Sequence, residues 1–158
     1  MMDHIGLIFK IPNQWNDVLY RITGNLQYPS VWSRSDHDEI LTQDYNGNIE
    51  PKSLFPENRK AIDNYQMKKY IQPNMVYYPI FVSFSVYFSK QKFYPTITTM
   101  HDFLSSPYHT VISTIDVTDV TVVSKEQAIL EKIEAVYNKL EFRNLHYLDR
   151  DKNKVLEF

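Results

Sequence analysis

The sequence Val-Tyr-Tyr-Pro-Ile-Phe-Val-Ser-Phe-Ser-Val-Tyr-Phe, residues 76–88, decides the fold. Its even-numbered residues are all apolar, whereas the odd-numbered side includes Ser83 and Ser85. An alternation with a period of two is typical of a β-strand that buries one face more deeply than the other. Pro79 has no N–H group for a strand ladder, so it indicates a sheet edge, a bulge or a later start. We therefore predict one long strand over residues 76–88, with its even-numbered side in the core.

The segments around this strand alternate between short strands and helices. Runs of β-branched and aromatic residues predict strands at residues 5–11, 31–34, 39–44, 110–115, 120–123 and 145–148. Helical spacing of apolar residues predicts helices after Asn13, at 57–71, at 98–104 and after Ser124, which forms a capping-box pattern with Gln127. Strands 31–34 and 39–44 are expected to be joined across residues 35–38, and strands 110–115 and 120–123 to form a hairpin. Asn46-Gly47 predicts a tight turn.

These elements predict an α+β fold, with a mixed or mainly antiparallel sheet and helices packed on one face. A chain of 158 residues is the size of one ordinary domain and can bury a real core. We expect residues 1–148 to form that single domain. Residues 149–158 are expected to be a frayed, charged tail.

Composition excludes several classes of protein. The net charge of -2 gives no field that would attract a polyanion, so nucleic acid is not an expected partner. The chain has no cysteine, which excludes disulfides, thiolate catalysis and cysteine-ligated zinc. Three isolated glycines cannot build the common nucleotide-binding loops, so no cofactor is expected. The longest apolar run, residues 76–82, is too short to span a membrane, and the N-terminus does not resemble a secretory signal, so we expect a cytoplasmic protein without membrane contacts.

Several short segments stand in an order that is typical of one family. They are FKIPN at 9–13, LFPE at 54–57, YYPIF at 77–81, DFLSS at 102–106, DVTV at 119–122, and the region of Phe142 and Tyr147–Leu148. On these segments the chain resembles the small bacterial proteins catalogued as domain of unknown function 2691, typical of spore-forming Gram-positive bacteria. The segments are packing and turn motifs, so the resemblance implies a single domain and a bacterial cytosolic origin but no catalytic residues.

The densest polar cluster is Asp36-His37-Asp38-Glu39, which has suitable ligands for a divalent metal ion. In an extended segment, however, Asp36 and Asp38 face away from His37 and Glu39, which splits the cluster. A solvated turn is the simpler interpretation, because Asp and Ser side chains favour turns.

A second candidate cluster comprises His101, Asp102 and His109. A carboxylate can orient an imidazole for acid–base work or metal binding. Consecutive residues of a helix point about 100° apart, so Asp102 is poorly placed to orient His101. The alternative is that Thr98 or Thr99 caps a short helix and Asp102 lies in its first turn. Together with the first cluster, His37, Asp38, His101 and Asp102 define one candidate function, a small metal-dependent hydrolase.

Aromatic residues make up 15% of the chain, including 12 tyrosines. Tyrosine is common in protein interfaces, so the odd side of strand 76–88 and its neighbours predict a binding surface. Its candidate residues are Tyr77, Phe81, Tyr87, Tyr94 and Tyr108. Ordinary core packing is the alternative for the same rings. Without a catalytic signature, the favoured hypothesis is a small cytosolic binding or regulatory module that contacts a protein partner or forms a homodimer, rather than an enzyme.

Overall fold

A computed structural model describes residues 4–24, 31–34, 38–52, 54–55, 61–72, 76–87, 96–151, 153–156 and 158, with only the backbone described at 31–34. The strands within these residues are β1 (Gly6–Lys10), β2 (Val31–Arg34), β3 (Glu39–Gln43), β4 (Ile49–Pro51), β5 (Ala61–Asp63), β6 (Tyr77–Tyr87), β7 (Thr110–Ile115), β8 (Asp119–Ser124) and β9 (Arg143–Leu148). The helices are α1 (Val18–Thr23), α2 (Asn64–Tyr70), α3 (Met100–Ser105) and α4 (Gln127–Lys139).

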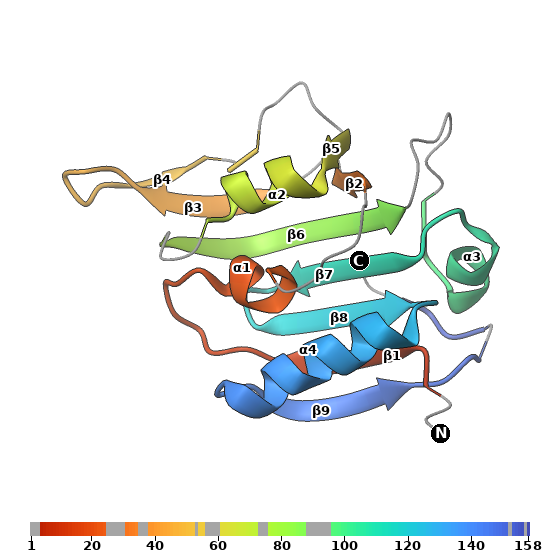
Figure 1. Ribbon diagram of the computed structural model, residues 1–158. Helices are drawn as coiled ribbons and strands as arrows, with labels where there is room; N and C mark the ends of the chain where they lie inside the picture. Colours follow the sequence, from red (N-terminus) through yellow and green to blue (C-terminus); the bar gives the residue numbers. More distant parts are fainter. Residues whose placement is uncertain are drawn as a thin grey trace.

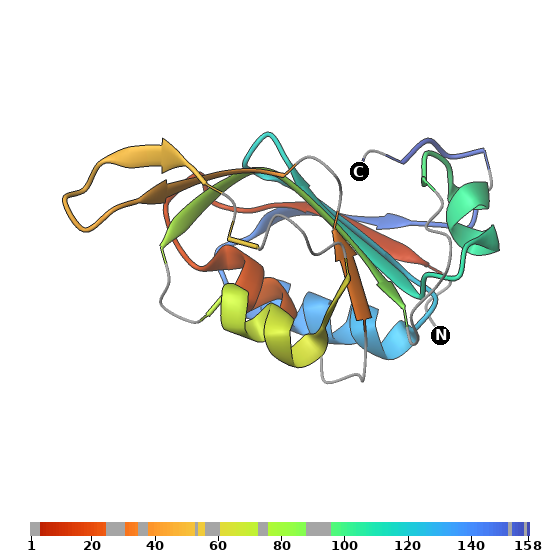
Figure 2. The same cartoon turned by 90° about the horizontal axis from the view of Figure 1, so that it is seen from above.

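The described strands form one antiparallel sheet, in the order β4-β3-β6-β7-β8-β1-β9 (Figure 1). β2 also pairs with β6, and β5 pairs with β2. Figure 2 shows α1, α2 and α4 on one face of this sheet, with α3 and the C-terminus towards the other face. The predicted α+β class is therefore confirmed. None of the helices that the structure describes combines the length and apolar character needed to cross a bilayer.

The hydrophobic residues form two cores, one on each face of the sheet. The main core lies under α1, α2 and α4, where Leu7, Val122, Ile112 and Phe84 follow one another across four paired strands. The second core lies on the opposite face, where Met100 and Phe103 of α3 cover the sheet. Alternate residues of the central strands therefore contribute to different cores, as the period of two requires.

Strand β6 contains the bulge that Pro79 indicated. Phe81 pairs with Glu39 and Pro79 pairs with Ile40, so Ile80 has no paired residue on β3. An unpaired residue shifts the alternation of side chains by one position. As a result Val82, Phe84 and Val86 join the main core from even positions, whereas before the bulge it is the odd-numbered Tyr77 that does so. The predicted burial of the even side holds only after the bulge.

Strands β2 and β3 do not pair with each other, so the expected connection of adjacent strands at 31–34 and 39–44 is not a hairpin. Both strands pair with β6, one after the other along its length. The eleven residues of β6 are long enough to hold two short neighbours on the same side. Residues 35–37, which connect them, lie outside the described residues.

The predicted helix at 57–71 is partly wrong, because Ala61–Asp63 forms β5 against β2. Helix α2 begins at Asn64, where the side chain of Asp63 accepts a hydrogen bond from the Gln66 N–H. An Asp at this capping position stops a helix from extending further towards the N-terminus. Residues 57–60 lie outside the described part of the chain.

The capping box predicted for Ser124 and Gln127 is absent. Ser124 ends β8, and α4 begins after Glu126, whose side chain makes no capping hydrogen bond. The Ser124 hydroxyl instead accepts from the Glu126 N–H and contacts the hydroxyl of Thr110. The hairpin between β7 and β8 is confirmed, with positive φ at Asp116 and Val117 in its turn.

The C-terminal segment packs against α3 and does not fray as we expected. The N–H of Leu156 donates to the Thr98 carbonyl, and Val155 forms a β-bridge with Thr99. The side chain of Leu156 is only 6% exposed and belongs to the second core. The sequence does not predict this packing, because one leucine among charged neighbours forms no periodic apolar pattern.

Candidate functional site

A hairpin projects from one end of the sheet. It consists of β3, β4 and the turn at residues 44–48, and we call it the arm. Both Figure 1 and Figure 2 show the arm extending past the helices at one end of the sheet. All three residues of β4 are exposed, and β4 is the last strand of the sheet on this side.

The turn of the arm is held together by Asp44. Its carboxylate accepts hydrogen bonds from the backbone N–H groups of Asn46 and Asn48, each at 2.9 Å. The Gly47 N–H donates to the Asp44 carbonyl at 3.0 Å, and Gly47 has a φ of 83°. Asp at the first position and Gly at the fourth are typical of a type I turn. These bonds, above all those from Asn48, lower the pKa of Asp44, so the carboxylate is charged at neutral pH.

Exposed apolar side chains gather on this arm. Tyr45, at the tip of the turn, is 97% exposed, and Ile49 at the start of β4 is 58% exposed. The register places Gln43 opposite Ile49 and Thr42 opposite Tyr77, so Val76, which is 50% exposed, falls beside the same part of the arm. Large apolar side chains that remain in water on an ordered element are typical of contact sites for other proteins.

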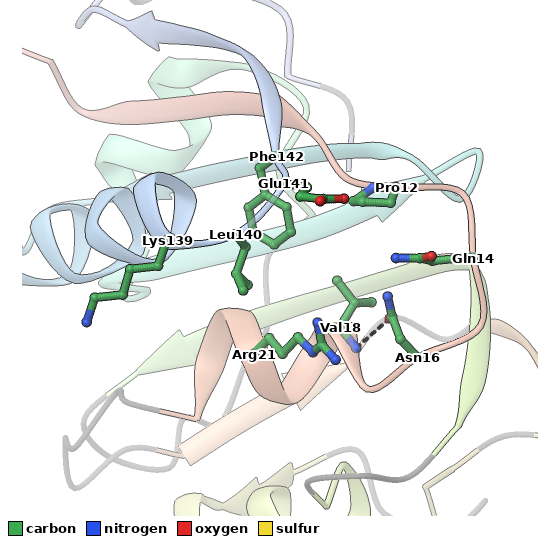
Figure 3. A pocket seen from close by; sticks show the side chains of 9 residues that line it. All are labelled: Pro12, Gln14, Asn16, Val18, Arg21, Lys139, Leu140, Glu141 and Phe142. Atoms are coloured by element: carbon green, nitrogen blue, oxygen red, sulfur yellow. Dashed lines mark hydrogen bonds between the residues drawn. The ribbon is translucent and has the colours of Figure 1, made fainter.

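A small cleft lies at the same end of the molecule as the arm, between the segment before α1 and the end of α4 (Figure 3). Its volume is about 160 Å³. The lining residues are Pro12, Gln14, Asn16, Val18, Arg21, Lys139, Leu140, Glu141 and Phe142. The cleft therefore has an apolar floor and a polar, charged rim.

Charges at the rim are largely balanced. The Nε of Arg21 donates to the Asp17 carboxylate at 2.6 Å, and Glu141 also lines the cleft. In Figure 3 the side chain of Lys139 extends away from the cleft, and within the described residues Lys139 makes no ion pair. This rim offers no concentrated charge to an anionic metabolite.

Helix α1, one wall of the cleft, is held from inside the core. Its N-terminal residue Asp17 makes no capping hydrogen bond with its side chain. The hydroxyl of the buried Tyr77 instead accepts from the N–H groups of Leu19 at 3.0 Å and Tyr20 at 3.3 Å. Asn16 adds a third bond, from the Val18 N–H. The sequence predicts a helix after Asn13, but α1 begins only at Val18. There the Tyr77 hydroxyl and the Asn16 side chain accept hydrogen bonds from its first N–H groups.

Of the three residues of the predicted metal site, the structure describes only Asp38. Asp36 and His37 lie outside the described residues, and Asp38 is half-buried at the start of β3. His101 is exposed on α3, which Figures 1 and 2 show at the opposite end of the sheet from the arm. Within the described ranges, no group of three or more His, Asp or Glu side chains could hold a metal ion.

Asp102 has the capping role that was the alternative to catalysis. The Thr99 side chain accepts from the Asp102 N–H, and the Asp102 side chain accepts from the Thr99 N–H, which completes a capping box. Hydrogen bonds from Thr98, followed by those from Thr99, lower the pKa of Asp102. The hydrolase hypothesis is therefore not favoured by this geometry.

His109 lies in a buried polar cluster at the start of β7. Its Nδ1 is 2.8 Å from the Thr110 hydroxyl, which is 2.8 Å from the hydroxyl of Ser124. Burial above all, together with the nearby positive charge of Lys125, lowers the pKa of His109 to about 4. The imidazole is therefore neutral at physiological pH, and the Thr110 hydroxyl that it contacts joins β7 to Ser124 at the end of β8.

Three of the five predicted binding aromatics are inaccessible. Tyr77 is buried in the main core, and Tyr87 and Tyr108 lie in the second core with ring centroids 6.0 Å apart. The expected exposure of these three rings is wrong, because the bulge turns Tyr77 towards the helices and α3 covers the other face. Phe81 is half-buried, and Tyr94 lies outside the described residues.

The sequence did contain a signal for the exposed aromatic residue that we missed. Tyr45 stands between Asp44 and Asn46-Gly47-Asn48, a run of residues that favour turns. A large aromatic side chain inside a predicted tight turn has no core residue within reach and is therefore exposed. The pattern that predicts the turn therefore also predicts an exposed ring at its tip.

Fold and surface together define an α+β protein with one antiparallel sheet and a projecting hairpin. Residues 4–157 match the family model described as "Protein of unknown function (DUF2691)", and the chain belongs to this family. No curated protein and no solved structure matches the chain significantly.

Proposed function

We propose that this protein is a protein-binding module and that the arm is its contact surface. The single observation that carries the proposal is Tyr45, which is 97% exposed at the tip of an ordered turn. The partner, the cytosolic location and the bacterial origin are predictions from the sequence.

An exposed tyrosine on an ordered turn is well suited to contact a partner. Tyrosine combines a large apolar ring with a hydroxyl, and it is enriched among the residues that dominate binding energy. A contact residue also binds more tightly when it is ordered beforehand, because less conformational entropy is lost on binding. The bonds of Asp44 to Asn46 and Asn48 supply that order on either side of the ring.

The remaining exposed apolar residues extend the contact area. Ile49 and Val76 lie next to the turn, and among the described strands none pairs with the outer edge of β4, which is therefore open to hydrogen bonds from a partner strand. An exposed strand edge is a common site for added strands. The proposed surface is thus a tyrosine at the tip, two aliphatic side chains behind it and a free backbone edge.

Site-specific photo-cross-linking tests this proposal. A photoreactive phenylalanine analogue is placed at position 45 in the full chain and irradiated in the cells that express it. We expect a discrete protein adduct, identified by mass spectrometry and mapped to the arm. Position 65 is the matched control, because Tyr65 is also a highly exposed tyrosine, at 81%, but lies on α2. No adduct at position 45, or equal adducts at both positions, would show that the arm is not a contact surface.

A further inference from the structure

We infer that the partner of the arm is a second copy of this chain, and that Tyr45 of each copy inserts into the α1–α4 cleft of the other. This inference rests on the proposed function and adds the identity of the partner and of the receiving site. It connects two features that the fold alone does not explain: an exposed ring on an ordered turn and a small cleft.

The size of the cleft suits one aromatic ring. Pockets for small-molecule ligands measure roughly 300–1,000 Å³, so about 160 Å³ is too small for most of them. A protein cavity of about 150 Å³ is known to accept a benzene ring. Val18, Leu140 and Phe142 supply apolar contacts for such a ring.

The chemistry of the rim suits a phenol rather than a purely apolar side chain. Gln14 and Asn16 carry amide groups at the cleft, which can hydrogen-bond the tyrosine hydroxyl. A buried tyrosine normally finds such a partner for its hydroxyl. An apolar floor with amides at the mouth therefore matches the two ends of the Tyr45 side chain.

Charge complementarity supports the same pairing. Asp44 is beside Tyr45, and Glu50 follows in β4, so the tip and outer strand of the arm carry two carboxylates. Lys139 stands exposed at the cleft and has no ion-pair partner within the part of the chain described here. An arm that approaches the cleft from outside brings a carboxylate towards this ammonium group, which extends outward from the cleft (Figure 3), and this favours one orientation of the arm.

The positions of the two features allow a closed, symmetric dimer. In Figure 1 the arm, α1 and the end of α4 all lie towards the left-hand end of the molecule, the arm at the top of the sheet and the end of α4 lower down, and residues of α1 and of the end of α4 line the cleft. A two-fold axis that brings these ends together carries each arm towards the other copy's cleft. Both contacts then form together, and no unoccupied binding surface remains to which further subunits could be added.

Sedimentation velocity of the full chain tests this dimer. We expect wild-type protein to dimerise with increasing concentration. Tyr45→Ser should weaken the dimer by about 30-fold or more, because it removes a central anchor residue. Tyr45→Phe, which keeps the ring, should weaken it by about tenfold at most. Tyr65→Ser is the control for loss of an exposed tyrosine and should leave the dimer unchanged.

Complementation distinguishes reciprocal insertion from other dimers. Gln14→Trp fills the mouth of the cleft but keeps Tyr45, whereas Tyr45→Ser keeps an open cleft. Each variant alone should be monomeric. Mixed together, they should form heterodimers, because one of the two contacts remains possible. If the mixture stays monomeric while wild-type protein dimerises, the arm does not occupy the cleft.

The absence of cysteine from the sequence allows a direct geometric test. The double variant Asn46→Cys with Gln14→Cys should form an intermolecular disulfide under mild oxidation, seen as a dimer on a non-reducing gel. Asn46→Cys with Tyr65→Cys is the matched pair on exposed sites and should stay monomeric. Monomeric wild-type protein together with an adduct to a different protein at position 45 would overturn this inference and leave the proposed function intact. No adduct at all would contradict both.

Discussion

The hydroxyl of Tyr77 connects the buried end of β6 to the first turn of α1. We expect Tyr77→Phe to lower the free energy of unfolding by about 2 kcal/mol, because the N–H groups of Leu19 and Tyr20 lose their acceptor in a buried place. Urea denaturation measures this loss. Tyr78→Phe is the matched control on the same strand, because its hydroxyl bonds to Asn13 at an exposed site. Equal losses in the two variants would mean that Tyr77 does not cap the helix.

For single residues, the sequence predicts the role of a side chain where that role depends on residues close to it in the chain. The capping function of Thr99 and Asp102 and the turn at Asn46-Gly47 follow from side chains within four positions of each other. The role of Tyr77 depends on an α-helix 57 positions away. Nothing in the local pattern distinguishes a tyrosine that caps from a tyrosine that binds.

At the scale of an element, the C-terminal segment is held against α3 by the buried side chain of Leu156. Leu156→Ala should lower the free energy of unfolding by about 2 kcal/mol, since the side chain is buried at the edge of the second core. Val155→Ala is the control, because Val155 is 69% exposed, and its change should stay within about 0.5 kcal/mol. Thermal or urea unfolding measures both. Two neutral substitutions would indicate a frayed segment, as the sequence first indicated.

The elements that sequence analysis placed correctly are those with a clear period, such as β6 and α4. The elements predicted wrongly are those whose structure depends on strand pairing or on packing against distant residues. The bulge at Ile80 lets β6 accept both β2 and β3 on one side, and its position depends on the partner strand. Residues 61–63 form a strand because β2 lies beside them, although their sequence continues a helical pattern. The same bulge removed Tyr77 from the predicted surface, so one unpaired residue changed both the fold and the candidate site.

The stability of the whole molecule should depend on the protonation of His109. Its pKa is lowered from 6.5 to about 4 on folding, so between these values the unfolded chain binds more protons than the folded one. Stability should therefore be fully present above pH 6.5 and fall as the pH decreases towards 4, by at most about 1.4 kcal/mol per pH unit from this group.

Denaturation curves at several pH values check this dependence. His109→Gln should flatten the curve between pH 6.5 and 4, whereas His101→Gln should leave it as in the wild-type protein, because His101 is exposed on α3. The remaining slope in His109→Gln comes from other titrating groups. An unchanged slope in this variant would contradict the assignment of the buried histidine.

The order of strands in the sheet sets a condition on synthesis by the ribosome. β1 lies between β8 and β9, and Lys10 meets Asp119 from 109 positions away. At typical rates of translation, roughly 5 to 20 seconds pass before the partner strand of β1 exists. During that time Leu7 and Phe9 have no sheet to join and remain exposed to chaperones. The part of the sheet around β1 therefore cannot form until β8 and β9 have been synthesised, so folding of this region is delayed relative to the synthesis of β1.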